Sequence, residues 1–198
     1  MTFSASYLQE SADIIARIDQ GPIERMAQLL GELRARDGRL FILGMGGGAG
    51  HASHAINDFR KIANFEAYSP CDNVSELTAR ANDEGLDTIY AAWLKGSRLR
   101  AGDMVMIFSV GGGDLERNIS AALVRAVEYA KSVGAVVTGV VGRDGGYTAR
   151  VADACVIVPV VNPDNITPHT ESFQALIWHL LVSHPAIKLA TNKWESQR

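Results

Sequence analysis

The sequence of 198 residues contains only two cysteines, Cys71 and Cys155, and they do not form a CxxC pair. Two isolated cysteines favour a reducing environment and a chain without a disulfide. No apolar run approaches the roughly 20 residues that a membrane-spanning helix needs. The N-terminal segment lacks a basic stretch followed by an apolar one, so we do not expect a secretory signal. These absences predict a cytoplasmic protein with no membrane partner.

The sequence also has little excess charge of either sign. The formal net charge is only −3, so no general attraction to nucleic acid or to an anionic membrane surface is expected. We find no repeats, charge blocks or low-complexity linkers. With 47% hydrophobic and 21% charged residues, the composition is typical of a globular protein with a buried core. The length then predicts one domain over residues 1–198.

Two hydrophobic patterns divide the chain. Up to residue 36, apolar residues recur every three or four positions with a break at Gly21-Pro22, which predicts two helices. Short apolar segments rich in β-formers then predict strands at 40–43, 104–109, 135–141 and 155–161, and a weaker one near 67–71. Helical patterns follow these strands at 50–64, 84–95, 115–132 and 170–184. The alternation predicts a doubly wound, parallel α/β/α sandwich at 38–198, preceded by a helical extension at 1–37.

Two of the predicted strands end directly in glycine-rich loops. The loops contain Gly44, Gly46, Gly47 and Gly48 in the first case, and Gly111, Gly112 and Gly113 in the second. Glycine lets backbone N–H groups approach a ligand, and a following helix start favours an anion. Both loops should meet at the carboxyl edge of the sheet, where ligands of such folds bind. Tight turns alone would also need glycines, so that alternative stays open.

Nucleotide-binding motifs are weak or absent in these loops. The first loop fits a dinucleotide fingerprint only loosely, and no clear acidic residue follows on a second strand. A Walker A sequence is missing, so we expect no nucleotide cofactor. Asp114 is expected to cap the helix after the second loop, where it would repel a phosphate. That leaves Ser109 as the hydroxyl of this loop.

Two predicted helices carry imidazole and carboxylate groups at helical spacing. His54 and Asp58 are four residues apart and share one face. Glu171 and His179 are eight residues apart, about two turns, and lie near one face. Such groups bind divalent metal ions or transfer protons. If the two helices meet, the four groups converge, although each could also be an ordinary core or surface residue.

Together these motifs resemble the sugar isomerase (SIS) domain family, and within it the phosphoheptose isomerases, over nearly the whole chain. Five segments carry the resemblance. They are GMGGGAGHASHAINDF at 44–59, similar to the family's GNGGS…DA…H…E stretch; NDEG at 82–85, similar to its NDxG; 109–114, in the place of its STSGxS phosphate loop; GRDGG at 142–146, similar to its G(K/R)xGG turn; and 170–181, similar to its closing Q-E-x-H…H helix.

The resemblance implies an aldose–ketose isomerase that acts on sedoheptulose 7-phosphate or a related sugar phosphate through an enediol(ate), for surface-polysaccharide heptose. Asp58 and His179 would be the catalytic carboxylate and imidazole. The implied ligands of zinc or another divalent metal are His54, Asp58, Glu171 and His179. The implied substrate-binding residues are Gly46, Gly47, Gly48, His51, Asp83, Ser109, Gly111, Gly112 and Gly113. The implied assembly is a homo-oligomer, a tetramer, in which the closing helix of one chain could meet the 50–64 helix of another.

The sequence departs from the family at the reactive groups. Asp58 stands in place of a glutamate, which would move the carboxylate by roughly an ångström and matters for proton transfer. Glu171 replaces an amide, and an additional carboxylate would strengthen binding of a divalent cation. His51 stands where the family has an aspartate, and Gly48 where serine is common.

The phosphate loop departs further. Its usual hydroxyl and amide residues are replaced by Val110, Gly111, Gly113 and Asp114. The phosphate would then be held by backbone N–H groups and a basic residue such as Lys61 or Arg117. The altered loop keeps two alternatives open. One is a non-catalytic SIS module that binds a sugar phosphate or a protein partner, although the retained histidine and carboxylate groups oppose it. The other is an isomerase or lyase for another phosphosugar.

Overall fold

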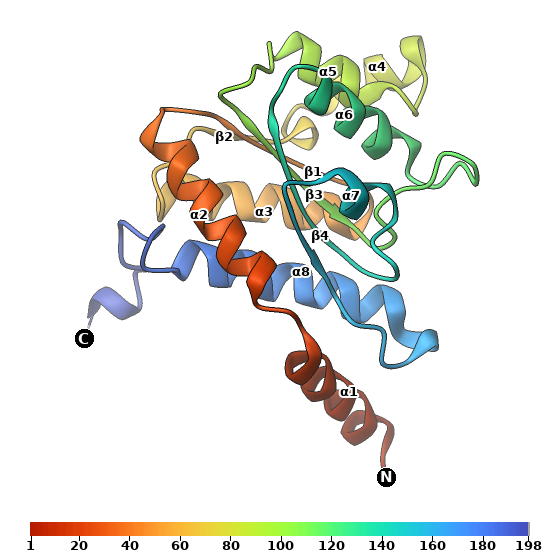
Figure 1. Ribbon diagram of the computed structural model, residues 1–198, viewed down its shortest axis with the longest axis vertical. Coiled ribbons are helices and arrows are strands. Elements are labelled where there is room, and N and C mark those ends of the chain that lie inside the picture. The colour runs from red at the N-terminus through yellow and green to blue at the C-terminus, as the bar shows by residue number, and fades with distance from the viewer. Residues whose placement is uncertain (198) are drawn as a thin grey trace.

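A five-stranded parallel sheet forms the centre of the protein, whose computed structural model describes residues 1–197 (Figure 1). The strand order is β2-β1-β3-β4-β5. The strands are β1 (Leu40–Gly44), β2 (Ala67–Tyr68), β3 (Met104–Ser109), β4 (Val136–Val141) and β5 (Ala154–Ile157). Every pairing is parallel, and β1 and β3 are in register from Leu40↔Met104 to Gly44↔Phe108. The predicted doubly wound fold is therefore confirmed.

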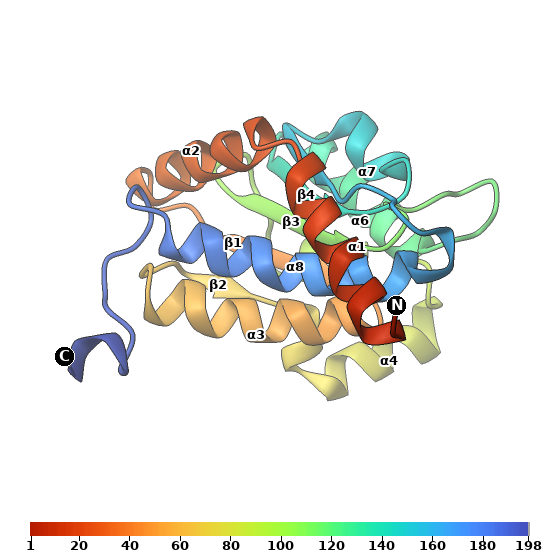
Figure 2. The ribbon, with the colours of Figure 1, turned by 90° about the horizontal axis from the view of Figure 1, so that it is seen from below.

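Helices cover both faces of this sheet, as Figures 1 and 2 show. One face carries α1 (Phe3–Arg17), α2 (Gly21–Ala35), α3 (Gly47–Lys61) and α8 (Ile166–Ser183). The other carries α4 (Val74–Glu84), α5 (Ile89–Gly96), α6 (Ala121–Ser132) and α7 (Gly146–Val151). Short 3-10 turns lie at Pro70–Asp72, Pro163–Asn165 and Glu195–Gln197. No helix among residues 1–197 is both long and apolar enough to cross a membrane.

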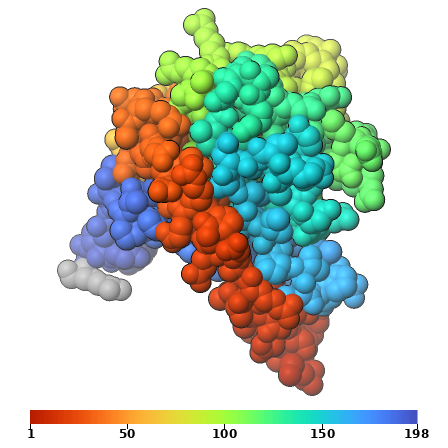
Figure 3. Space-filling model, viewed as in Figure 1, coloured from red at the N-terminus to blue at the C-terminus, as the bar shows by residue number. Residues whose placement is uncertain are grey.

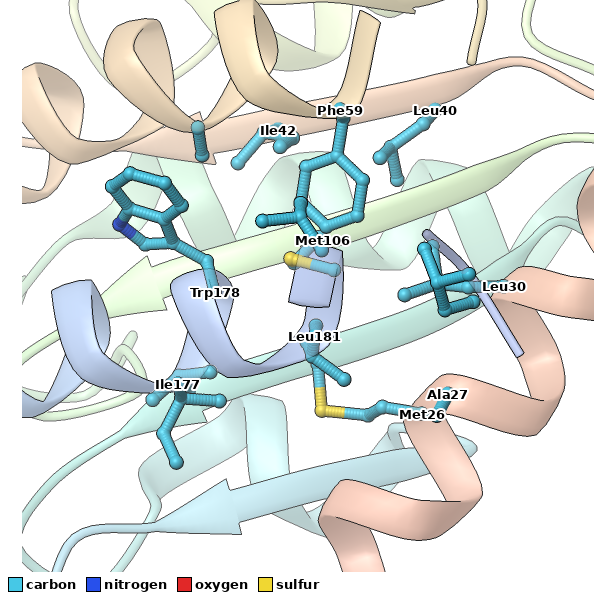
Figure 4. Packing of buried hydrophobic residues seen from close by; sticks show 14 of the residues in the cluster. Met26, Ala27, Leu30, Leu40, Ile42, Phe59, Met106, Ile177, Trp178 and Leu181 are labelled. Atoms are coloured by element: carbon cyan, nitrogen blue, oxygen red, sulfur yellow. The ribbon is translucent and has the colours of Figure 1, made fainter. Parts of the chain in front are cut away.

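The sheet is buried on both sides, which explains why its strands are continuously apolar. In β1, Leu40 and Ile42 point to the face with α3 and α8, whereas Phe41 and Leu43 point to the face with α5 and α6. Figure 4 shows the larger of the two cores, where α2, α3 and α8 meet β1 and β3. Its labelled residues include Met26, Leu30, Ile42, Phe59, Met106, Trp178 and Leu181.

Four predicted helices have other bounds in the structure, and the one expected at 50–64 is α3, Gly47–Lys61. The helix expected at 84–95 is interrupted, because Gly85 takes φ +90° between α4 and α5. The helix expected from 115 begins at Ala121, because Asp114 and Ile119 form an isolated β-bridge across the preceding loop. Asp114 is therefore not the cap of α6, and that prediction was wrong. The last helix begins at Ile166, and neither α4 nor α7 was expected.

The N-terminal helix α1 projects from the body (Figures 1 and 3). It is attached through the buried Ile14 and through a polar cluster around Glu10. Ile14 is its only buried residue. The Glu10 carboxylate lies 2.7 Å from His169 Nε2 and accepts hydrogen bonds from the side-chain amides of Asn162 and Asn165. The Tyr7 ring stacks on His169 with 4.4 Å between centroids. His169 lies inside α8 and is buried, rather than flanking the helix as its sequence position suggested.

We predict that Phe59→Ala lowers the free energy of unfolding by about 3–5 kcal/mol, because it leaves a cavity in the core that α3 and α8 share. Phe59 is fully buried. Val74→Ala is the matched control, since this residue is 68% exposed and its truncation should cost little. Chemical denaturation of the two variants tests the expectation, and a cost below about 1 kcal/mol for Phe59→Ala would contradict it.

The contact of Glu10 predicts an acid-sensitive attachment of α1. Hydrogen bonds from His169 first, and then from Asn162 and Asn165, lower the pKa of Glu10 from 4.5 to about 2. A lowered carboxyl pKa stabilises the contact fully above pH 4.5, and this stabilisation is lost as the pH falls towards 2.

We therefore expect hydrogen-exchange protection of the α1 amides, corrected for intrinsic rates, to fall over this pH range. Glu10→Gln should already lack that protection at neutral pH, because the carboxylate charge is gone. Asp13→Asn is the control, since Asp13 is a partly exposed carboxylate of the same helix that accepts a hydrogen bond only from the Gln9 side chain. Equal protection of α1 in Glu10→Gln and the unchanged protein at pH 7 would contradict the expectation.

Candidate active site

The seam between α3 and α8 brings together three of the four predicted metal ligands. Ligand atoms of His54, Asp58 and His179 all lie within 4.8 Å of one another. His179 Nε2 is 3.9 Å from Asp58 Oδ2, and the rings of His54 and His179 are 5.6 Å apart. The two helices meet within one chain, so no second copy is needed to bring these groups together. His54 and His179 are exposed, which leaves the cluster open to a ligand.

Hydrogen bonds already orient two members of this cluster. His179 Nδ1 lies 2.7 Å from the carbonyl oxygen of Ala175, one turn earlier in α8. A carbonyl can only accept, so Nδ1 carries a proton and the lone pair of a neutral ring is on Nε2, which faces Asp58. The Asn57 side-chain amide donates to Asp58 Oδ1 at 2.8 Å, which leaves Oδ2 towards His179. The arrangement suits either a cation or a proton between the two groups.

Trp178 forms the floor of the cluster. It is fully buried, its ring stacks on His179 at 3.4 Å between centroids, and its edge-on partner at 4.7 Å is His54. Figure 4 shows Trp178 pointing from α8 towards α3. Packing against a fixed aromatic ring restricts the rotamers of both imidazoles, so α8 contributes both His179 and the ring that supports it.

Glu171 lies outside this cluster, near the first glycine loop. Its carboxylate fills the space beside Gly47, so closely that any Cβ at Gly47 would overlap it. His51, one turn into α3, is half-buried. Its pKa is lowered, because the effect of burial is larger than the opposing effect of the Glu171 charge. The roles of Glu171 as a metal ligand and of His51 in substrate binding stay predictions.

Close backbone packing explains Gly48 in the first loop and Gly112 in the second. A Cβ at Gly48 would lie 2.7 Å from the Phe108 carbonyl oxygen, so glycine lets α3 approach β3. Gly112 takes φ +70°, and a Cβ there would overlap the Gly145 carbonyl. The Thr148 side chain and backbone both donate to the Gly112 carbonyl. The second loop is thereby fixed against the 142–148 turn, with Gly46, Gly47 and Gly111 placed at the same edge of the sheet.

Two adjoining hollows lie at this carboxyl edge, on the side of α6. The smaller has a volume of about 180 Å³ and is lined in part by Ser109, Gly111, Ser120 and Arg143. The larger, of about 390 Å³, shares Met45 and Ser120 with it, and its other lining residues are Leu86, Asp87, Asn118, Ala121 and Ala122. Ser109 is buried, and its Oγ accepts the Gly112 N–H at 3.1 Å, which leaves its own proton free for a ligand.

The remaining predicted residues lie elsewhere. Lys61 ends α3, at the opposite end from the glycine loop, so it cannot hold an anion there. Arg117 is exposed and pairs with Asp114 at 3.7 Å. Asp83 is exposed near the end of α4, where Asn82 donates to it, and it lines neither hollow. Arg143, in the GRDGG turn, lines the smaller hollow, which the sequence patterns did not indicate.

Tyr90 is a second residue that sequence patterns did not reveal. Strand β2 pairs only with Leu40 and Phe41, so the far end of β1 lacks a strand partner on that side. The buried Tyr90 hydroxyl takes the place of the missing strand and donates a hydrogen bond to the Gly44 carbonyl oxygen at 2.6 Å. Burial raises the pKa of Tyr90, with the neighbouring Cys71 contributing, so the hydroxyl stays a donor at neutral pH. This bond fixes the point where the first glycine loop begins.

Comparison with known proteins supports the same architecture. The SIS domain family model matches residues 6–142. The phosphoheptose isomerase of Rhodospirillum rubrum is 30% identical over 184 residues, which is 89% of this chain and 92% of that protein. The lincomycin biosynthesis protein LmbN of Streptomyces lincolnensis is 31% identical over 89% of this chain and 66% of its own length. The structure of phosphoheptose isomerase GmhA from Neisseria gonorrhoeae aligns with a TM-score of 0.78 and 26% identity, over 91% of this chain and 96% of that one.

The chain therefore belongs to the SIS domain family. Within that family it is similar to the phosphoheptose isomerases, in sequence over most of its length and in fold over nearly all of it. The family predicted from the sequence motifs is confirmed.

We predict that Tyr90→Phe lowers the free energy of unfolding by about 1–3 kcal/mol, because it leaves the buried Gly44 carbonyl without a donor. Tyr68→Phe is the matched control, since its exposed hydroxyl donates only to Glu66. Denaturant titrations of both variants measure the difference. Equal stability of the two would mean that the Tyr90 hydroxyl does not support this loop.

Proposed function

We propose that the protein is a sugar-phosphate isomerase that interconverts the ketose and aldose forms of sedoheptulose 7-phosphate or a related substrate. The comparisons support the isomerase class, since relatives of this name match most of the chain. The observation that carries the proposal is the cluster of His54, Asp58 and His179 at the seam of α3 and α8. It supplies the two kinds of group that the reaction needs.

An aldose–ketose isomerisation moves a proton between C1 and C2 and another between their oxygens. A carboxylate or imidazole within hydrogen-bond reach can carry each proton. His179 suits this role because its Nδ1 proton is held by Ala175 and its Nε2 is free to accept a proton and return it. Asp58 is next to it and largely buried, with its side chain 14% exposed, so it can stabilise the protonated imidazole or act as the base itself.

The same groups fit a divalent metal ion. Two imidazoles and one carboxylate are donors that zinc accepts, and their atoms are close enough to share one ion. His54, Asp58 and His179 would hold it, with Glu171 as the more distant predicted ligand. When bound, such an ion would polarise the substrate carbonyl. The lone pair of His179 cannot bind a metal and a proton together, so metal content determines which role it has.

The proposed assembly is a homotetramer in the cytoplasm. Apolar residues that are exposed on the single chain support an interface between copies. They include Leu8 and Ile15 of α1 and Leu176 and Leu180 of α8, close to His179 in the sequence. Similarity to LmbN as well as to phosphoheptose isomerases leaves the pathway open, so surface-polysaccharide heptose stays a prediction.

We expect purified protein to convert sedoheptulose 7-phosphate and to contain close to one divalent metal ion, zinc being the proposed one, per chain. His179→Ala should lose the metal ion, and its turnover should fall by roughly 100- to 10,000-fold, the usual contribution of a positioned acid–base group. Elemental analysis and a coupled turnover assay measure the two properties. His184→Gln is the matched control, since this histidine of the same region pairs with Glu24 at 3.3 Å and is not part of the cluster.

The outcomes separate the alternatives. Turnover without a bound metal ion would support the proposed isomerase activity and would assign His179 to proton transfer alone. Neither metal nor turnover, with binding of the sugar phosphate retained, would favour the non-catalytic SIS module that the altered phosphate loop suggests. Turnover of another phosphosugar in a substrate panel would favour the related isomerase.

A further inference from the structure

Arg143 is a cation held at the carboxyl edge of the sheet by an unusual backbone. It lies between β4 and α7 and takes φ +55°, a left-handed conformation that residues other than glycine, asparagine and aspartate rarely adopt. The turn is closed by the Gly145 N–H, which donates to the Gly142 carbonyl at 3.0 Å. Strain of this kind persists where the surroundings fix the backbone, and it occurs often at ligand sites.

The guanidinium of Arg143 has no internal charge partner in the described part of the chain. Arg143 is exposed, and no carboxylate of residues 1–197 lies within 4.0 Å of its guanidinium. Its stem lies beside Gly111, 3.7 Å from the position of a Cβ there, and it lines the hollow of about 180 Å³. An unpaired guanidinium beside a cavity can bind an oxyanion through two parallel hydrogen bonds.

Other donors converge on the same hollow. The Ser109 hydroxyl has a free proton, as described above, and Ser120 lines both hollows. Helix α6 begins at the next residue, with no side-chain cap and no acidic residue in its first turn. Its first N–H groups lack intrahelical acceptors, and its dipole favours a negative ligand.

Asp114, the acidic residue that would oppose an anion here, is paired within its own loop. The Asp114 carboxylate accepts the Arg117 N–H at 3.1 Å and pairs with the Arg117 side chain at 3.7 Å. Because Asp114 lies seven residues before Ala121, the start of α6, it does not cap that helix. Arg117 is occupied by this contact, which leaves Arg143 as the basic side chain lining the hollow.

We propose that Arg143 binds the phosphate group of the substrate in this hollow and replaces the hydroxyl groups that the loop at 109–114 lacks. The inference rests on the proposed function for the identity of the ligand, a phosphate monoester. It does not depend on the His54, Asp58 and His179 cluster, because no residue of that cluster lines the hollow. Anion binding and turnover can therefore be lost separately.

Calorimetric titration of the full chain with inorganic phosphate tests the proposal directly. Arg143→Asn should weaken phosphate binding by roughly 10- to 100-fold, the range for hydrogen bonds to a charged group. Asparagine tolerates the left-handed backbone, so the turn is preserved. Arg143→Lys should be intermediate, since it keeps the charge and loses the paired geometry. Arg125→Gln is the matched control, because Arg125 pairs with Glu128 on the outer side of α6. This variant should bind phosphate with the affinity of the wild-type protein.

Steady-state kinetics supply the second readout. With sedoheptulose 7-phosphate, Arg143→Asn should raise KM by a similar factor and change kcat much less, because the anion lies away from the reacting carbons. Unchanged phosphate affinity in Arg143→Asn, or a loss in Arg117→Gln instead, would overturn the proposal. If the protein binds phosphate through Arg143 but does not turn over the sugar, the proposed function fails and the anion site stands.

Discussion

The arrangement of the site depends on how closely α3 can approach the sheet. Gly44 and Gly48 are in mutual contact, and a Cβ at Gly48 would lie 2.7 Å from the carbonyl oxygen of Phe108. Helix α3 therefore starts directly at the end of β1, without a longer connection. Its position in turn sets the seam with α8, since Phe59 and Trp178 fill the space between these helices and the sheet. A side chain at Gly48 would displace the helix that carries His54 and Asp58.

The seam with α8 gives the imidazole and carboxylate groups their geometry. His54 and Asp58 share a face of α3 because they are one turn apart, and α8 presents His179 opposite them. Trp178 and Ala175 then limit the ring of His179 by stacking and by a hydrogen bond. Glu171, two turns before His179, reaches the start of α3 instead. The spacing of eight residues thus places the two groups at different ends of the seam.

Hydrophobic periodicity was sufficient to predict the sheet and most helices, because buried parallel strands are continuously apolar and leave a strong signal. It failed between 114 and 120, where Leu115 and Ile119 continue a helical spacing. The chain instead turns through positive φ at Asn118 and Ser120, and apolar spacing does not encode this. The positions of Tyr90 and Arg143 at the edge of the sheet could not be predicted from the sequence either. The partner of Tyr90 is a backbone carbonyl 46 residues away, and GRDGG is an ordinary turn sequence.

The loop after β3 departs further from the family pattern than the cluster on the seam of α3 and α8, where Asp58 stands in place of a glutamate. The cluster on the seam of α3 and α8 retains two imidazoles and a carboxylate, whereas the loop after β3 has lost its hydroxyls. These two parts are held by different contacts, the first by helix packing and the second by the 142–148 turn. The groups that bind the anion can therefore change while the reactive groups keep their positions. In the proposed anion site, the guanidinium of Arg143 on the neighbouring turn would supply charge where hydroxyls are missing, so the altered loop is consistent with a changed mode of anion binding in a working enzyme.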